Sequence, residues 1–432
     1  MRRNFFILNK VFLYFFSIFF FIVSFPLAII ARFACLCNRS QKKLVWGSTP
    51  IINNSYWSNS MVEKGYFSET FTTDYYTTIN KRSDWDKLLR EEYFFAFNFI
   101  KPYIAFLHSL FVYDVFFISF DGFFIGSTPA WFLQAQLFKL SGKKIVVIPY
   151  GSDAYIYNRI RSLGTIHGLL SSYPSAAKKQ RQIAKKVDYW CAHAHAVIPC
   201  FMGPDGFGRW DVLLPNSLMI DLKKWKSSIK NDLGDGIHGK VVIVHAPNHR
   251  GFKGTEFIIE AVTNLQEEGL NVELKLLEQI SNTEVQKVLE TSADILVDQL
   301  VCSGHGLNAI EGMCSGIPTI SNLDDEFYIT VLRRWSYFNE CPLVSSSPET
   351  ITEVLRKLVT RPELRRELGM AGRAYVEKYH GLDSAQYLFS NVIDYVYGRK
   401  ESLINLYHPI LGDYPNRSPK IKHPLVNNRI VD

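Results

Sequence analysis

Cysteine is scarce in this sequence of 432 residues and follows no pattern. There are seven cysteines, an odd number without the spacing of a disulfide framework, which in a chain of this length indicates free thiols in a reducing compartment. Zinc-site spacings and aspartate-rich metal motifs are also missing, so no metal is expected. The net charge of +7 comes without a zinc-finger or RNP-like motif, so it indicates anionic lipid surfaces or phosphorylated ligands, and no nucleic acid.

A cleavable secretory leader is not indicated, although the N-terminus is strongly apolar. Residues 11–31 carry no charge, and as a helix with about 1.5 Å rise per residue they would span roughly 30 Å, the thickness of a bilayer core. The run is longer than the apolar part of a signal peptide, and no small-residue cleavage site follows it. Cations flank the run on both sides and slightly favour the C-terminal side as cytoplasmic; they are Arg2, Arg3, Lys10, Arg32, Arg39, Lys42 and Lys43.

This apolar run predicts a membrane anchor over residues 1–40. One interpretation is a helix that crosses the bilayer once. The alternative is a re-entrant or surface-lying helix, because Pro26 can kink a spanning helix or turn a hairpin.

Beyond the anchor, strand-like and helix-like segments alternate, which is typical of βα units and parallel sheets. Strands are expected at 43–46, 115–120, 144–149, 196–199 and 212–215, and after a polar stretch at 241–245, 272–277, 294–297 and 317–320. Helices are expected at 255–269, behind a capping box at 281–284, and at 306–315, 349–358 and 362–379.

The sequence therefore predicts an α/β protein with two Rossmann-like domains that face a cleft. The N-terminal, acceptor-side domain is expected at 41–225, a linker at 226–239, the C-terminal, nucleotide-binding domain at 240–385, and a C-terminal helix with an irregular tail at 386–432. Ligands of such sheets bind outside the carboxyl ends of the strands, so the site is expected in the cleft.

The first candidate site is HAPNHRGFKGT, which runs from the strand at 241–245 towards the next helix. Backbone amides and the helix dipole at such a turn favour an anion. Arg250 and Lys253 add two positive charges, while Gly251 and Gly254 allow close approach of the backbone. The segment would suit a pyrophosphate; alternatively, it is a basic surface turn before an ordinary helix.

The second and third candidate segments follow the strand at 294–297. DQLVCSGHGL leads through two glycines into a helix, an arrangement that also suits an anion but is common in α/β proteins. Glu311 follows within that helix, where a carboxylate can accept hydrogen bonds from a ribose diol. By itself, Glu311 would be read as a solvated helix residue.

Together these segments resemble the donor domain of GT-B glycosyltransferases, specifically the retaining family 4 (glycosyl transferases group 1), in the branch that makes bacterial surface polysaccharides. The specific motifs lie within 245–379 and are HAPNHRGFKGTEFIIEAVTNL, ADILVDQL, GHGLNAIEGMCSGIPTI and RPELRRELGMAGRAYVEKYH. The first half is similar mostly in architecture, through GSTPIINNSYWSNSMVEKG, IPYGSD and LLPNSLMIDLKKW. The resemblance implies the GT-B fold and a nucleotide-sugar donor that is a substrate, with no cofactor.

The resemblance also implies roles for single residues. Arg250 and Lys253 would bind the donor's phosphates and stabilise the charge that builds there, and Glu311 would hold the ribose. The backbone at Gly304 and Gly306 would approach the sugar or the diphosphate, and Asp153 would face the acceptor or the transferred sugar. Further candidates are Ser303 and Asn248 on the donor side, and Gly47 and Ser152 on the acceptor side.

One position departs from the family. Its usual glutamates lie eight positions apart, and the first would fall at Ser303, which cannot act as an anionic acceptor. The sugar hydroxyls must then be held in another way. Because of this departure, the alternative that the chain is a catalytically inactive scaffold of a polysaccharide-assembly complex stays open.

The implied function is transfer of a sugar to a lipid-linked glycan acceptor, with retention of configuration, on the cytoplasmic side of a bacterial inner membrane. Another sugar-nucleotide enzyme on the same architecture, such as an epimerase or a polyol-phosphate polymerase, is an alternative. The apolar anchor favours a lipid-linked substrate over soluble epimerisation.

A basic cluster in the first domain is a separate hypothesis. Its cations would rest on anionic headgroups and aim the cleft at a lipid-linked acceptor. The alternative is a solvated basic helix. The cluster consists of Lys178, Lys179, Arg181, Lys185 and Lys186.

Overall fold

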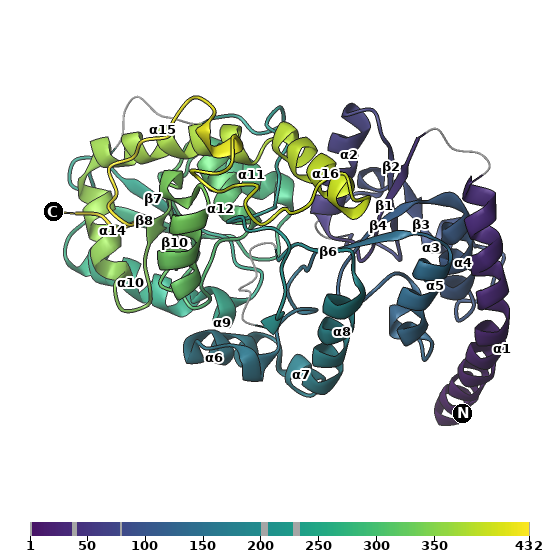
Figure 1. The fold of residues 1–432 in the computed structure, drawn as a ribbon. Helices are drawn as coiled ribbons and strands as arrows, with labels where there is room; N and C mark the ends of the chain where they lie inside the picture. The colour runs from purple at the N-terminus through teal and green to yellow at the C-terminus, as the bar shows by residue number, and fades with distance from the viewer. Residues whose placement is uncertain (1, 37–40, 78–79, 200–205, 228–233, 432) are drawn as a thin grey trace.

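The chain folds into two lobes, each built on a parallel sheet, with a long helix at the outer side of the first lobe (Figure 1). This computed structural model describes residues 2–36, 41–77, 80–199, 206–227 and 234–431, with side chains from Phe16 on. The predicted α/β class with two parallel-sheet domains is confirmed. Part of the predicted linker (228–233) and the flanking cation Arg39 lie outside the described residues.

The first lobe holds a six-stranded sheet in the order β3-β2-β1-β4-β5-β6, all parallel. Its strands are β1 (Lys43–Ser48), β2 (Phe67–Thr72), β3 (Lys87–Leu88), β4 (Val115–Ile118), β5 (Lys144–Val147) and β6 (Ala196–Val197). Its helices are α2 (Ile52–Glu63), α3 (Leu89–Glu92), α4 (Lys101–Val112), α5 (Gln134–Leu140), α6 (Leu163–Ser172), α7 (Pro174–Ala177) and α8 (Gln180–His193).

One expected strand of this lobe is wrong, and two strands were not expected. Residues 212–215 do not join the sheet; Val212 makes only an isolated bridge to Leu403. The run is apolar because it is buried between the lobes, and a short buried run looks the same in either setting. Conversely, β2 interrupts its Phe and Thr residues with Ser and Glu, and β3 has only two residues, Lys87 and Leu88, so neither stood out as a strand.

The second lobe holds a five-stranded parallel sheet in the order β11-β10-β9-β7-β8. Its strands are β7 (Val241–His245), β8 (Val272–Leu276), β9 (Ile295–Gln299), β10 (Thr319–Ser321) and β11 (Val344–Ser345). Its helices are α9 (Arg250–Lys253), α10 (Thr255–Glu267), α11 (Asn282–Thr291), α12 (Leu307–Cys314), α13 (Arg333–Trp335), α14 (Ile351–Thr360), α15 (Pro362–Tyr379) and α16 (Leu382–Val396).

Burial and capping explain why this half was predictable. All residues of β7 and β9 are buried, as expected for strands covered by helices on both faces. The capping box is present, because Ser281 and Glu284 each accept a hydrogen bond from the other's backbone amide at the start of α11.

The helix α16 leaves the second lobe and packs on α2 of the first (Figure 1). Phe389 of α16 is fully buried. Its ring lies 4.8 Å from that of Trp46, 5.6 Å from that of Trp57 and 5.4 Å from that of Phe117. The C-terminal helix therefore fastens the two lobes together through aromatic packing.

We expect Phe389→Ala to lower the free energy of unfolding by about 3–5 kcal/mol, because it leaves a cavity among rings that cannot collapse into it. Urea denaturation followed by tryptophan fluorescence measures this loss. The matched control is Phe257→Ala on the partly exposed face of α10, which should change stability far less. Equal effects would contradict the role of α16.

The N-terminal helix α1 (Arg2–Leu36) is continuous, with Pro26 inside it. A hairpin turned at Pro26 is therefore wrong. The helix lies along α4 and α5, where Ser17 Oγ and Tyr103 Oη are 2.7 Å apart and Phe20, Ala28 and Ala31 are buried. Among the described residues, one stretch is long and apolar enough to cross a membrane, and it is Phe16–Ala34 of this helix.

Candidate functional site

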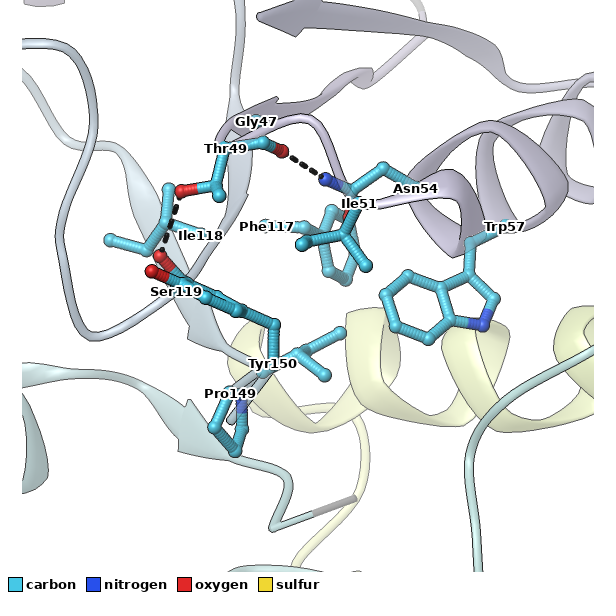
Figure 2. A pocket seen from close by; sticks show the side chains of 11 residues that line it. Gly47, Thr49, Ile51, Asn54, Trp57, Phe117, Ile118, Ser119, Pro149 and Tyr150 are labelled. Carbon is cyan, nitrogen blue, oxygen red and sulfur yellow. Dashed lines mark hydrogen bonds between the residues drawn. The ribbon is translucent and has the colours of Figure 1, made fainter. Parts of the chain in front are cut away.

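The first lobe has a cavity, partly open to solvent, at the carboxyl ends of β1, β4 and β5 (Figure 2). Trp57, Phe117 and Ile148 form apolar walls. Thr49 Oγ1 and Ser119 Oγ lie 3.3 Å apart at the polar side. Aromatic walls with a few hydroxyl groups are the surface that suits the faces and hydroxyls of a sugar ring.

Gly47, which was predicted on the acceptor side, lines this cavity. A Cβ at residue 47 would run into the backbone carbonyl of Phe71 on the neighbouring strand β2. The absence of a side chain therefore allows β1 and β2 to approach at the cavity. Ser152, the other acceptor-side candidate, is exposed on the loop after β5 and is not among the residues that line the cavity.

Asp121, which the sequence reasoning missed, connects the cavity to α8. Its carboxylate accepts hydrogen bonds from the Tyr150 hydroxyl at 2.7 Å and from Lys186 Nζ at 2.9 Å, and Tyr150 lines the cavity. Lys186 is thus buried in an ion pair and is wrong as a member of a lipid-facing cluster. Lys178, Lys179, Arg181 and Lys185 are exposed.

The structure places Asp153 in a different role from the one predicted. Its side chain is buried and accepts hydrogen bonds from the backbone amides of Phe120, Tyr150 and Gly151 at 2.9–3.0 Å. Burial raises the pKa of Asp153 to about 7, while these amides act in the opposite direction. The amides of Tyr150 and Gly151 belong to the loop after β5 and that of Phe120 to the loop after β4, so Asp153 ties these two loops together.

In the second lobe, the segment after β7 differs from its expected form. A one-turn helix, α9, is closed by Gly254, whose φ of 77° favours glycine. The amide of Phe252 donates to Ser172 Oγ of the first lobe at 2.8 Å. One of the backbone amides that were expected to hold an anion, that of Phe252, is therefore already bonded to α6.

Arg250 and Lys253 point to different surroundings. Arg250 is 45% exposed and pairs with Glu256 at 3.4 Å and Glu278 at 3.2 Å, both from its own lobe. Asn248, before α9, is also exposed. The predicted phosphate role of Arg250 is thus unsupported by its position, because two carboxylates hold its guanidinium at the surface.

Lys253 is buried instead, at the carboxyl end of β9. Its Nζ lies 2.6 Å from Asp298 Oδ1 and 3.0 Å from Gln299 Oε1. The other oxygen of Asp298 accepts the amide hydrogen of Gly306 at 3.0 Å. The structure thus brings Lys253 and Gly306 together through Asp298, at the foot of the predicted glycine loop.

Asp298 and Gln299 are the donor-side residues that the sequence reasoning did not single out. Gln299 Nε2 donates to the carbonyl groups of Cys302 and Gly304 at 3.1 Å and 2.9 Å, and so fixes the loop. Gly304 has a φ of 99°, and a Cβ there would clash with the Tyr328 hydroxyl. The available signal was two polar residues directly after an apolar strand, where α/β sheets carry their sites.

Glu311 lies on α12 and is nearly fully buried. Burial raises the pKa of its carboxyl group to about 8, and a hydrogen bond with Asn282 acts in the opposite direction. The charge of Glu311 helps to raise the pKa of Tyr56 on α2, after burial of that phenol itself. Glu311 is therefore close to the seam between the lobes.

Ser303 lies at a second cavity, partly open to solvent, between the lobes. The second lobe contributes Cys302, Ser303 and Asp325, and the first lobe contributes residues of 154–165, Gly206 and Phe207. Tyr155 Oη and Cys302 Sγ lie 3.8 Å apart across the seam. Ser303 therefore faces the cleft where the resemblance places the sugar.

Asn216 and Ser217, which precede the predicted linker, bond to both lobes. Asn216 Nδ2 donates to the carbonyl of His305 in the glycine loop at 2.9 Å. The indole of Trp57 on α2 donates to the carbonyl of Ser217 at 2.9 Å. Two adjacent residues, Asn216 and Ser217, therefore bond to the glycine loop of the second lobe and to the Trp57 wall of the first cavity.

The arrangement matches known two-lobed glycosyltransferases. Sucrose-phosphate synthase from Thermosynechococcus elongatus superposes with a TM-score of 0.54 at 12% identity, covering 83% of this chain and 100% of that one. HepE from Anabaena in complex with UDP gives a TM-score of 0.52 at 10% identity, with coverages of 82% and 100%. At such identities the likeness shows the fold, which is of the GT-B type.

No protein-family model and no curated protein matches the sequence. The family 4 assignment and its surface-polysaccharide branch stay predictions.

Proposed function

We propose that this chain is a glycosyltransferase that moves a sugar from a nucleotide-sugar donor to a glycan acceptor. One observation carries the proposal: in a GT-B fold, a buried ammonium and a glycine-loop amide meet on Asp298 at the carboxyl end of β9. HepE, which has this fold, was solved with UDP. In the proposed complex the donor diphosphate lies beside Lys253 and the glycine loop.

The proposed chemistry uses Lys253 as the main fixed positive charge. As the bond between sugar and diphosphate breaks, negative charge builds on the leaving phosphate, and an ammonium positioned beforehand stabilises it without reorganising water. Asp298 and Gln299 hold the ammonium in place before the donor arrives. The Glu311 carboxylate accepts hydrogen bonds from the ribose diol.

The acceptor is proposed to bind in the cavity of the first lobe. Its apolar walls can stack on a sugar face, while Thr49, Ser119 and Tyr150 offer oxygens to sugar hydroxyls. We further propose that the sugar is transferred with retention of configuration to a lipid-linked acceptor. The reaction would serve surface-polysaccharide synthesis on the cytoplasmic side of a bacterial inner membrane. The apolar stretch of α1 supports the membrane part of the proposal.

A non-catalytic scaffold is the second candidate, and two observations favour it. Ser303 stands where the family has a glutamate, and α6 already bonds to α9, at the predicted phosphate segment. A scaffold could still bind the nucleotide sugar, but it would transfer nothing.

We expect one nucleotide sugar to stabilise the full chain in detergent during a thermal-shift screen of UDP-, GDP-, ADP- and CMP-sugars. At a concentration of about 100 times Kd, binding adds about 2.7 kcal/mol of stability. Radiolabelled transfer to a bacterial membrane extract, unaffected by EDTA, would then support the enzyme. Binding without transfer would favour the scaffold, and no shift with any of these donors would refute the proposed enzyme.

A further inference from the structure

The outer side of the first lobe carries a large apolar surface that the catalytic proposal does not use. On α1, seven large side chains are 45–66% exposed. In the loop after α3, three phenylalanines are 70–81% exposed. We call these ten residues the outer apolar face; they are Ile18, Phe19, Phe21, Ile22, Ile29, Ile30 and Phe33, with Phe94, Phe95 and Phe97.

The helix and the loop form one continuous surface. Phe16 of α1 lies 6.0 Å from Phe19 and 6.3 Å from Phe99, ring to ring. Phe99 in turn stacks on Phe97 at 6.0 Å, and Phe94 and Phe95 contact each other at 5.8 Å. Aromatic contacts thus lead from the helix through Phe99 to Phe97, and the chain itself joins Phe97 to Phe94 and Phe95.

The opposite side of α1 is occupied by protein. Phe20 and Tyr103 of α4 contact at 4.8 Å, and the small residues Ser24, Ala28 and Ala31 are fully buried against the lobe. Figure 1 shows α1 running along the outside of α4 and α5. A helix held this way offers only one side to lipid, whereas a helix that crosses a bilayer alone is surrounded by lipid.

We propose that the chain is monotopic: the outer apolar face lies in one leaflet, α1 runs along the membrane plane, and both ends of α1 stay on the side of the catalytic lobes. Interfacial helices sink about 5–10 Å into a bilayer with a polar face towards water. Here the packed lobe takes the place of that polar face. The proposal deepens the membrane association proposed above and does not depend on sugar transfer.

The charges around the face suit a bilayer with anionic headgroups as its occupant. Arg32 near the end of α1 and Lys139 at the end of α5 are both exposed. They are neighbours, because the amide of Gly142 donates to the Lys139 carbonyl and a Cβ on Gly142 would lie 3.8 Å from Arg32 Cγ. Cations at the rim of an apolar surface bind anionic lipid headgroups.

Topology gives the decisive test. An epitope fused ahead of Met1 of the full chain is probed with protease in inside-out and right-side-out inner-membrane vesicles. We expect digestion of the epitope and of the catalytic lobes only in inside-out vesicles. Digestion of the epitope only in right-side-out vesicles would show a crossing helix and overturn the proposal.

The loop is tested by Phe94→Ser/Phe95→Ser/Phe97→Ser, with Ile410→Ser/Leu411→Ser as the matched control of exposed apolar residues on the C-terminal tail. Alkaline carbonate should extract the triple variant about tenfold more readily than the wild type, and the control should not change. Unchanged extraction of the triple variant would overturn the proposal. Light scattering that shows a wild-type dimer and a monomeric triple variant would also overturn it, because a second copy of the chain would then cover the outer apolar face. The wild type, the triple variant and the control should show the same thermal shift with a nucleotide sugar. This measurement tests the donor proposal independently of membrane binding.

Discussion

Lys253→Met is expected to lower sugar transfer by about 10²–10³-fold, because it removes the ammonium that stabilises the leaving diphosphate. It should also lower the free energy of unfolding by about 3–5 kcal/mol, since Asp298 would be left as a buried carboxylate without its partner. Transfer rates with saturating donor and urea denaturation measure the two effects. Because both losses follow from one substitution, the single variant cannot separate catalysis from folding.

A second substitution separates them. In Lys253→Met/Asp298→Asn no unpaired charge remains, and the asparagine oxygen can still accept the Gly306 amide. Stability should largely recover while transfer stays low. Arg250→Met is the matched control, because its exposed pairs are worth about 0–1 kcal/mol, and it should keep most activity. Recovery of transfer in the double variant would refute the role of Lys253, and an equal loss in Arg250→Met would refute the surface placement of Arg250.

Glu311→Gln should weaken donor binding by about 10–100-fold above pH 8, since a hydrogen bond to a charged acceptor contributes about 1.5–3 kcal/mol. Burial raises the pKa of Glu311 to about 8, so in the wild type the ribose meets a carboxylate only once the pH approaches that value. Affinity of the wild type should therefore increase from pH 6.5 to 9. Calorimetric titration across this range should give an almost flat profile for the variant.

The same pKa has a consequence for stability. Between the usual pKa of 4.5 and about 8, the folded chain binds a proton at Glu311 that the unfolded chain has lost. Stability therefore falls as the pH rises through this window, by about 1.4 kcal/mol for each unit of the shift. Glu311→Gln should be more stable relative to the wild type at pH 9 than at pH 5, whereas parallel pH profiles would contradict the buried carboxyl.

The sequence predicted best what depends on local pattern. The buried strands β7 and β9, the capping box before α11 and the bounds of α15 follow from runs of apolar residues and local hydrogen-bond chemistry. The glycine loop followed from its motif, and the structure adds Asp298 as the residue that joins it to Lys253.

What could not be predicted depends on contacts between distant segments. Arg250 is held by Glu278, which lies on the far side of α10 and β8 in the sequence. Asp153 looked functional because its motif places it after a strand, but the amide of Phe120, 33 positions earlier, turns its carboxylate inward. Neither partner is close enough in sequence to produce a local pattern.

Two of the contacts between the lobes lie far apart in Figure 1: α16 packs on α2, and α6 packs on α9. The first contact consists of large buried rings around Phe389, whereas the second combines the hydrogen bond from Phe252 to Ser172 with the rings of Tyr173 and His249, which lie 4.3 Å apart. The rings of the first contact are buried, whereas Tyr173, His249 and Phe252 of the second are only half-buried, so we expect relative movement of the lobes to be larger at α6 and α9 than at α16 and α2.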